Sequence, residues 1–335
     1  MDINHFHFFE EQDLNSYLKP REGETKIGEK ISYGNDFNNS ATRFVLLGIE
    51  ESIGVKGNLG VSGTHTAWDS FLKAFLNIQH NLKLNGESIH LLGNFNFQEF
   101  ADNAKSVKDF RGLVPYIDDA VYPLIQEISA AGKIPIIIGG SHANAFPIIK
   151  GVSKSKNTAI NVINLDAHAD FRALEGRHSG NSFSTAKAGG FMADYSILGL
   201  HENYNSQNML DEMAKHKGIR YYYWEDIYLR KKITFENALN DFIQLNQNKA
   251  CGIELDMDSI EGVLSSAMTP SGFTTTEARY YAYKSGHNLH PVYFHICEAA
   301  TELESGLKDN STGKLLSYLV SDFVKGGGWR DNGVN

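Results

Sequence analysis

The run Asn164-Leu165-Asp166-Ala167-His168-Ala169-Asp170 lies at the end of the apolar segment 159–165. Side chains two residues apart on an extended strand point to the same side, so Asp166, His168 and Asp170 can converge on one point at the strand's end. Such groups repel or desolvate one another unless a cation lies between them. The stretch therefore predicts a strand that ends in a metal site.

Two other apolar segments end in residues of the same kind. One ends in Leu255-Asp256-Met257-Asp258, and the other, Ile136-Ile137-Ile138-Gly139-Gly140-Ser141-His142, closes with a Gly-Gly turn and a histidine. Taken alone, either motif is typical of an ordinary turn or helix cap. Because the carboxyl ends of parallel strands meet at the same edge of a sheet, the three motifs together predict one metal centre. Its six candidate ligands are His142, Asp166, His168, Asp170, Asp256 and Asp258.

The chemistry of these ligands favours a particular ion. Carboxylates and imidazoles without a thiolate suit Mn²⁺ or another octahedral ion better than a structural zinc. Asp166 and Asp256 are the natural bridging carboxylates, since each has a further ligand in its own run. Two cations about 3.5–4 Å apart ionise a water held between them. We therefore expect two Mn²⁺ per chain and a hydrolytic enzyme.

Strand-like and helix-like segments alternate after residue 42. We expect strands at 44–49, 89–92, 134–138, 159–165, 195–200, 219–223, 250–255 and 292–296, and helices at 66–79, 114–131, 235–245, 275–284 and 312–324. Thr274 and Glu277 have the spacing of a capping box. This alternation predicts an α/β fold with a mostly parallel sheet and helices on both faces. We expect residues 1–42 to form an N-terminal extension and residues 43–335 to form a single catalytic domain.

Composition narrows the classes of function. The net charge of -9 argues against a nucleic-acid surface. No apolar run approaches the roughly 20 residues of a membrane span, and no signal-peptide pattern begins the chain. Cys251 and Cys297 both lie in apolar runs, which indicates buried thiols in a reducing compartment. We expect a cytoplasmic enzyme with no nucleic-acid or membrane partner.

In order and spacing, Gly-Gly-x-His142, Asp166-x-His168-x-Asp170 and Asp256-x-Asp258 resemble the three signatures of the arginase, agmatinase and formimidoylglutamase family, the ureohydrolases. The resemblance implies a three-layer αβα domain with an eight-stranded parallel sheet and a binuclear Mn²⁺ centre. It also implies a homo-oligomer, a trimer or a hexamer. One ion would be held by His142, Asp166, Asp170 and Asp256, and the other by Asp166, His168, Asp256 and Asp258.

Departures from the pattern point to one member of the family. Arg172 stands where arginases carry an Asn, and Phe183 stands where they carry a catalytic His. Ser141 replaces the Asp of the usual Gly-Gly-Asp-His motif. These features resemble formimidoylglutamases, and Glu298 matches the family's amidine-facing or guanidinium-facing glutamate. The resemblance implies hydrolysis of N-formimidoyl-L-glutamate to L-glutamate and formamide, a step of histidine degradation.

The substrate would be held by residues after the metal strand. It carries two carboxylates, so we expect Arg172 to pair with one of them and Ser179 and Asn181 to hydrogen-bond it. The alternative roles, without substrate contact, are a surface ion pair for Arg172 and the shaping of a turn for Ser179 and Asn181. Asp170 would orient the attacking water and relay a proton, and Glu298 would bind the amidinium.

Two other functions stay open on the sequence. The first is an arginase or another guanidino-acid hydrolase that releases urea, for which Glu202 is the candidate partner of the substrate's ammonium group. The second is a non-catalytic ureohydrolase-like protein, although all six ligand positions are intact.

Overall fold

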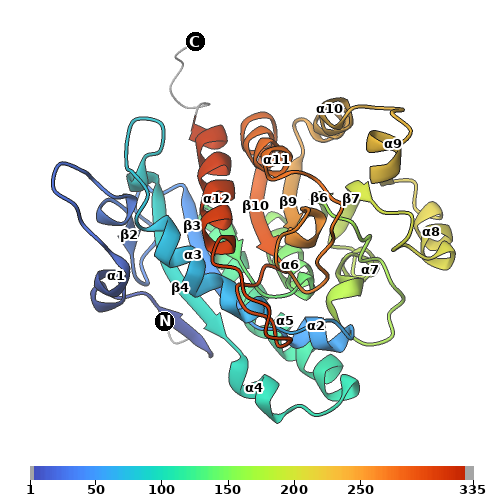
Figure 1. The fold of residues 1–335 in the computed structure, drawn as a ribbon, viewed down its shortest axis with the longest axis horizontal. Helices are drawn as coiled ribbons and strands as arrows, with labels where there is room; N and C mark the ends of the chain where they lie inside the picture. Colours follow the sequence, from blue (N-terminus) through green and yellow to red (C-terminus); the bar gives the residue numbers. More distant parts are fainter. Residues whose placement is uncertain (1–3, 329–335) are drawn as a thin grey trace.

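The sheet is the centre of the fold in the computed structural model, which describes residues 4–328 (Figure 1). Its ten strands follow the order β1-β4-β3-β5-β10-β9-β6-β7-β8, with β2 paired to β4. They are β1 (Phe6–Phe8), β2 (Ser32–Tyr33), β3 (Phe44–Glu50), β4 (Ile89–Asn96), β5 (Ile134–Ile138), β6 (Ile160–Leu165), β7 (Met192–Leu200), β8 (Ile219–Tyr223), β9 (Ala250–Asp256) and β10 (His290–Cys297). β1 is antiparallel to β4, and the other pairings between these strands are parallel.

Helices cover both faces of this sheet. They are α1 (Glu11–Tyr17), α2 (Ile53–Gly57), α3 (Ala67–Phe75), α4 (Gln98–Asn103), α5 (Val107–Ala130), α6 (Ala145–Lys156), α7 (Ser182–Ala188), α8 (Gln207–Ala214), α9 (Trp224–Tyr228), α10 (Phe235–Asn246), α11 (Thr275–Asn288) and α12 (Thr312–Gly328). One apolar core joins α3, α10, α11 and α12 to one face, and the other joins α5, α6 and α7 to the opposite face (Figure 1). The predicted α/β class with three αβα layers is confirmed.

The apolar runs form strands because both of their faces are covered. All six residues of β6 are buried, including its two Asn, as are the last four of β5, so these strands lack the alternation with exposed polar residues that marks a half-exposed strand. All eight strands expected from the sequence are present, and β1 and β2 bring the sheet within 4–328 to ten strands where the resemblance implied eight. The strand expected at 89–92 extends to Asn96, and the one expected at 195–200 begins at Met192. The helix from Thr275 begins at the predicted capping box, in which the Thr274 hydroxyl accepts a hydrogen bond from the Glu277 amide.

Some helices were not expected from the sequence. α5 begins at Val107 rather than at 114, and α6, α7 and α8 were not predicted at all. The N-terminal segment extends the sheet, because β1 and β2 both pair with β4. Residues 1–3 of the predicted N-terminal extension and residues 329–335 of the predicted catalytic domain lie outside the described residues. Within 4–328 no helix has the length and apolarity that a membrane span requires.

The sheet order places the site. β5, β10, β9 and β6 are consecutive neighbours, and all are parallel. Their carboxyl ends therefore meet at one edge of the sheet, and each strand has a candidate site residue at its end or in the loop that follows it. Those residues are His142 after β5, Glu298 after β10, Asp256 at the end of β9 and Asp166 after β6.

Candidate metal centre

The six predicted ligands come together at this edge of the sheet. His142, Asp166, Asp256 and Asp258 are buried, and His168 and Asp170 are partly exposed. Their ligand atoms fall into two groups, and within each group all of them lie within 4.8 Å of one another. The groups are His142, Asp166, Asp170 and Asp256, and Asp166, His168 and Asp258.

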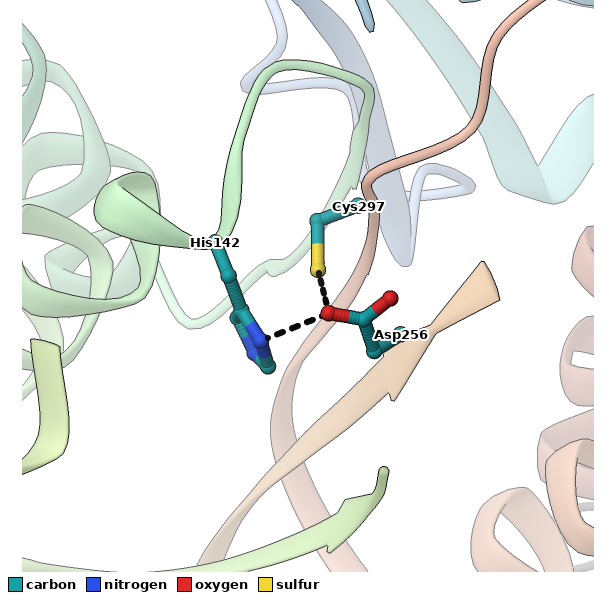
Figure 2. A group of neighbouring side chains, drawn as sticks. All are labelled: His142, Asp256 and Cys297. Atoms are coloured by element: carbon teal, nitrogen blue, oxygen red, sulfur yellow. Dashed lines mark hydrogen bonds and ion pairs between the residues drawn. The ribbon is translucent and has the colours of Figure 1, made fainter. Parts of the chain in front are cut away.

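The first group surrounds one ring nitrogen of His142. Its Nδ1 lies 2.9 Å from Asp170 Oδ2, 3.0 Å from Asp256 Oδ2 and 3.2 Å from Asp166 Oδ2. No hydrogen bond with acceptable geometry joins Nδ1 to any group of residues 4–328. Figure 2 shows one oxygen of the Asp256 carboxylate facing both the His142 ring nitrogen and the Cys297 sulfur. A nitrogen that faces three carboxylates without donating to them has the arrangement of a metal ligand.

The second group shares Asp166 with the first. His168 Nδ1 lies 3.1 Å from Asp258 Oδ2 and 3.6 Å from Asp166 Oδ1. Asp256, the second carboxylate predicted as a bridge, lies in the group of His142. Its Oδ1 accepts a hydrogen bond of 2.8 Å from the Asp258 backbone amide, just as Asp166 Oδ1 accepts one of 2.7 Å from the His168 amide. The structure thus makes Asp166 the carboxylate common to both groups.

The electrostatics of the cluster fit a pair of cations. Burial, together with the neighbouring Asp258 and Asp166, raises the pKa of Asp256 well above its usual range. Burial also raises the pKa of Asp170, although His142 lies beside it. His142 and His168 lower the pKa of Asp166 to about 2 despite its burial, and a cation would in the same way favour the ionised forms of Asp256 and Asp170. The donor set, carboxylates plus two imidazoles, fits divalent ions of the Mn²⁺ type.

Glu298 ties the end of β10 to the loop that carries His142. Its Oε1 accepts a hydrogen bond of 2.7 Å from the His142 backbone amide, and its Oε2 accepts one from the Ser266 hydroxyl. Burial raises the pKa of Glu298 to about 8. A buried carboxylate of this kind favours a cationic neighbour, and an amidinium group is such a neighbour.

A cavity of about 210 Å³ opens beside both groups. Of the residues predicted to bind substrate, Arg172 and Ser179 lie in its wall, with Asp170 and Glu298. Asn181 does not line it. The Asn181 amide is buried, donates to the carbonyl oxygens of Ala173 and Gly176, and accepts from Arg177. Asn181 therefore shapes the loop, which was the alternative to substrate binding for this residue.

The charged groups around the cavity mouth already have partners. Arg172 donates to Asn58 Oδ1 at 3.2 Å and to Glu175 Oε1 at 3.3 Å, and its side chain remains 52% exposed. It is therefore accessible to a ligand. Glu202, the candidate partner for an arginine substrate, pairs with Arg230 at 2.7 Å and is not in the cavity wall.

Sequence reasoning missed several residues around the site. Ser266 and Tyr204 line the cavity, and the Tyr204 ring stacks on His168 with centroids 5.1 Å apart. Glu254 and His295 lie buried beneath His142. One signal was present: Glu254 precedes Asp256 by two residues on a strand, so it continues the same alternation that marked Asp256 and Asp258.

Comparison with known proteins decides the family. The model of the arginase family matches residues 43–324. This chain belongs to the arginase family. A formimidoylglutamase from Staphylococcus carnosus is 24% identical over 324 residues, which cover 96% of this chain and 93% of that protein. One from Streptococcus pyogenes is 31% identical over 134 residues, 38% of this chain and 41% of that protein.

Solved structures show the same fold. The formimidoylglutamase of Bacillus subtilis superposes with a TM-score of 0.75 at 19% identity, covering 94% of this chain and 97% of that one. Formiminoglutamase from Trypanosoma cruzi, solved with Mn²⁺, gives a TM-score of 0.71 at 17% identity over 90% of this chain and 98% of that one. These likenesses establish the arginase-family fold.

The departures within this arginase-family member have visible structural consequences. Phe183 is fully buried, stacks on Tyr195 with centroids 4.3 Å apart, and sets its edge against the His142 ring. The phenylalanine side chain has no ionisable group, so it cannot relay a proton. Ser141 is held by Glu51, whose Oε1 accepts from the Ser141 amide at 2.5 Å. A carboxylate from the loop after β3 thus secures the turn in which Ser141 replaces Asp.

Proposed function

We propose that this chain hydrolyses a linear amidine, N-formimidoyl-L-glutamate, to L-glutamate and formamide, with two Mn²⁺ ions. The proposal rests on one observation: a single cavity is lined by residues of both ligand groups, by the buried Glu298 and by the accessible Arg172. The match to formimidoylglutamases over nearly the whole chain supports the same substrate.

The ions, when bound, would lower the pKa of a shared water and stabilise negative charge on the amidine carbon's substituents. His142, Asp166, Asp170 and Asp256 would hold one, and Asp166, His168 and Asp258 would hold the other. Glu298 binds the amidinium N–H groups and orients the carbon. Arg172 holds a substrate carboxylate at the mouth.

Asp170 is placed to move the proton. It lies in the cavity wall and its Oδ2 belongs to the first ligand group. The C–N bond between the formimidoyl carbon and the glutamate nitrogen breaks, the water oxygen joins that carbon, and Asp170 returns a proton from the water to the leaving amine. The reaction is a step of histidine degradation, and we propose a cytoplasmic homo-oligomer as its setting.

A substrate panel tests the proposal. Purified protein loaded with Mn²⁺ is incubated in parallel with formimidoylglutamate, arginine, agmatine and guanidinobutyrate, and glutamate, formamide and urea are measured. We expect formamide and glutamate from formimidoylglutamate and little urea from the guanidino compounds, because Glu202 is already paired with Arg230. Urea release from arginine at the higher kcat/KM would contradict the substrate but not the metal centre.

The metal part of the proposal has its own test. Asp256→Asn removes a charge that faces His142 at 3.0 Å. We expect activity to fall by more than about 100-fold and the bound Mn²⁺ per chain to decrease, since ligation is lost. Asp322→Asn is the matched control, because Asp322 is a buried carboxylate paired with Arg279 on α11 and α12, away from the centre. Unchanged metal content in Asp256→Asn would contradict the assignment of this ligand.

A further inference from the structure

A cluster of buried polar side chains lies beneath the metal centre, on β9 and β10. Glu254 Oε1 accepts a hydrogen bond of 2.7 Å from the Tyr293 hydroxyl, and Glu254 Oε2 lies 2.7 Å from His295 Nδ1. Glu254 and His295 are direct partners in the parallel pairing of the two strands. All three side chains are fully buried.

Stability of the fold does not explain this cluster. Ile137, the β5 residue paired with His295, is apolar and equally buried, and Asn164, the β6 residue paired with Glu254, is uncharged. A buried ion pair is often no more stable than apolar residues of the same volume. A carboxylate in the middle of a parallel sheet must lose its water and depends on every hydrogen bond it can accept. Its placement therefore indicates a task in the site above it.

The position of Glu254 relative to His142 suggests that task. His142 Nε2 lies 3.5 Å from Glu254 Oε2, and it has no hydrogen-bond partner within residues 4–328. If these two atoms moved closer by about half an ångström, they would form a hydrogen bond of ordinary length. The other nitrogen of the same ring, Nδ1, is the one that faces Asp166, Asp170 and Asp256. The ring thus lies between Glu254 on one side and the ligand carboxylates on the other.

We propose that Glu254 is a positioning residue, which accepts the Nε2–H of His142 and so presents the Nδ1 lone pair to the first metal ion. Tyr293 and His295 hold the Glu254 carboxylate in place for this role. A histidine that binds a metal generally donates its other ring N–H to a carboxylate or carbonyl, which fixes the tautomer and raises the ligand's basicity. The inference rests on the metal-binding part of the proposed function, and it adds residues that touch neither ion nor substrate.

The test measures metal affinity rather than activity alone. Metal-free wild type, Glu254→Gln and Tyr293→Phe are titrated with Mn²⁺, and free Mn²⁺ is followed by its electron paramagnetic resonance signal. In Glu254→Gln we expect one of the two sites to weaken by about 10- to 100-fold and the other to stay within about twofold. Tyr293→Phe removes one hydrogen bond to Glu254 and should weaken the same site by a smaller factor.

Asp322→Asn is again the matched control, since it removes a buried carboxylate far from His142. Its two Mn²⁺ affinities should equal those of the wild type. At saturating Mn²⁺, Glu254→Gln should recover most of its kcat with KM for the amidine unchanged, which loss of packing alone would not give. If Glu254→Gln does not fold, Tyr293→Phe and its site-selective weakening carry the test.

Three outcomes would overturn the positioning role. Two unchanged affinities in both variants would show that His142 needs no carboxylate partner. Equal weakening of both sites would indicate a general structural effect. A third ion per wild-type chain, absent from Glu254→Gln, would make Glu254 itself a ligand, together with His295 and Cys297, whose ligand atoms lie within 4.8 Å of it. Failure of the wild type to bind Mn²⁺ would instead refute the proposed function, and the inference with it.

Discussion

Asp170 and Glu298 both have left-handed backbone conformations, with φ of 46° and 60°. A non-glycine residue held in this region costs on the order of 1–3 kcal/mol and persists only where the surroundings impose it. At Glu298 the constraint is visible, since its amide donates to Gly140 and its carboxylate accepts from His142 and Ser266. Both residues that we assign to catalysis are thus among the seven non-glycine residues within 4–328 that have a positive φ, which agrees with preorganised roles.

Arg172 carries the substrate selectivity in this interpretation. Arg172→Ala should lower kcat/KM for formimidoylglutamate by about ten- to a hundred-fold, the equivalent of a charge-assisted hydrogen bond of about 1.5–3 kcal/mol. Arg172→Lys should lose less, because it keeps the charge but not the bidentate geometry. Steady-state kinetics at saturating Mn²⁺ measure both variants.

Metal content should be unchanged in Arg172→Ala, since Arg172 belongs to neither ligand group. An unchanged kcat/KM in that variant would show that Arg172 serves only its ion pair with Glu175.

Single residues could be predicted from the sequence where their spacing along one strand defines a shared direction. Asp166, His168 and Asp170 alternate within one run, and the structure brings them together. The partnership of Glu254 with His295 could not be predicted in this way, because it depends on which strands are neighbours and on their register. Asn181 shows the converse: its neighbours in sequence suggested a substrate ligand, and its buried hydrogen bonds make it a loop residue.

At the level of elements, strands were easier to predict than helices. β5 and β8 have the bounds expected from their apolar runs. The predicted helix 114–131 missed the first turns of α5, although it already contained Pro115 and Pro123, each of which removes a backbone donor. The start of α5 is fixed instead by a capping box between Ser106 and Asp109, a signal that lies outside the apolar pattern.

The end of β3 supplies a prediction about pH. Burial and the nearby Asp69 raise the pKa of Glu50 to about 7, although Asn94 and Asn96 both donate to its carboxylate. A carboxyl group whose pKa is higher in the folded state stabilises the fold below its unfolded value, about 4.5, and this contribution is lost as the pH rises through about 7.

Glu50→Gln keeps an acceptor for Asn94 and removes the ionisation. Relative to the wild type, it should therefore gain about 1–2 kcal/mol of unfolding free energy between pH 5 and pH 8.5, after allowance for solvent screening. Urea unfolding of both proteins at the two pH values measures the gain. Glu87→Gln, the same substitution at an exposed position, is measured in parallel as the control. Parallel pH profiles for Glu50→Gln and the wild type would show that Glu50 ionises freely in the folded protein.

For the whole molecule, the alternation of segments was enough to predict the layered α/β architecture, because each strand and helix must bury its apolar face against the other kind. The contribution of the N-terminal segment was not predictable in the same way. β1 and β2 contain three and two residues, too short for a period to be read, and they join the sheet through backbone pairing with β4.

The metal centre should also govern the stability of the whole molecule. Its carboxylates converge from β6 and β9 and from the loops after them, so bound cations would hold these elements together. Free Mn²⁺ at 100 times its dissociation constant stabilises the folded state by about 2.7 kcal/mol per site. For a chain of this size we expect the melting temperature to rise by at least about 5 °C on going from chelator to saturating Mn²⁺.

Scanning calorimetry over a series of Mn²⁺ concentrations measures this effect, and the melting temperature should keep rising with the logarithm of the concentration above saturation. Asp256→Asn is the matched control. It removes part of the repulsion among the buried carboxylates as well as a ligand, so its metal-free form should melt higher than the metal-free wild type and should gain less from Mn²⁺. A wild-type melting temperature that is the same in chelator and in Mn²⁺ would mean that the carboxylates at this sheet edge are neutralised by protons, and the binuclear assignment would then fail.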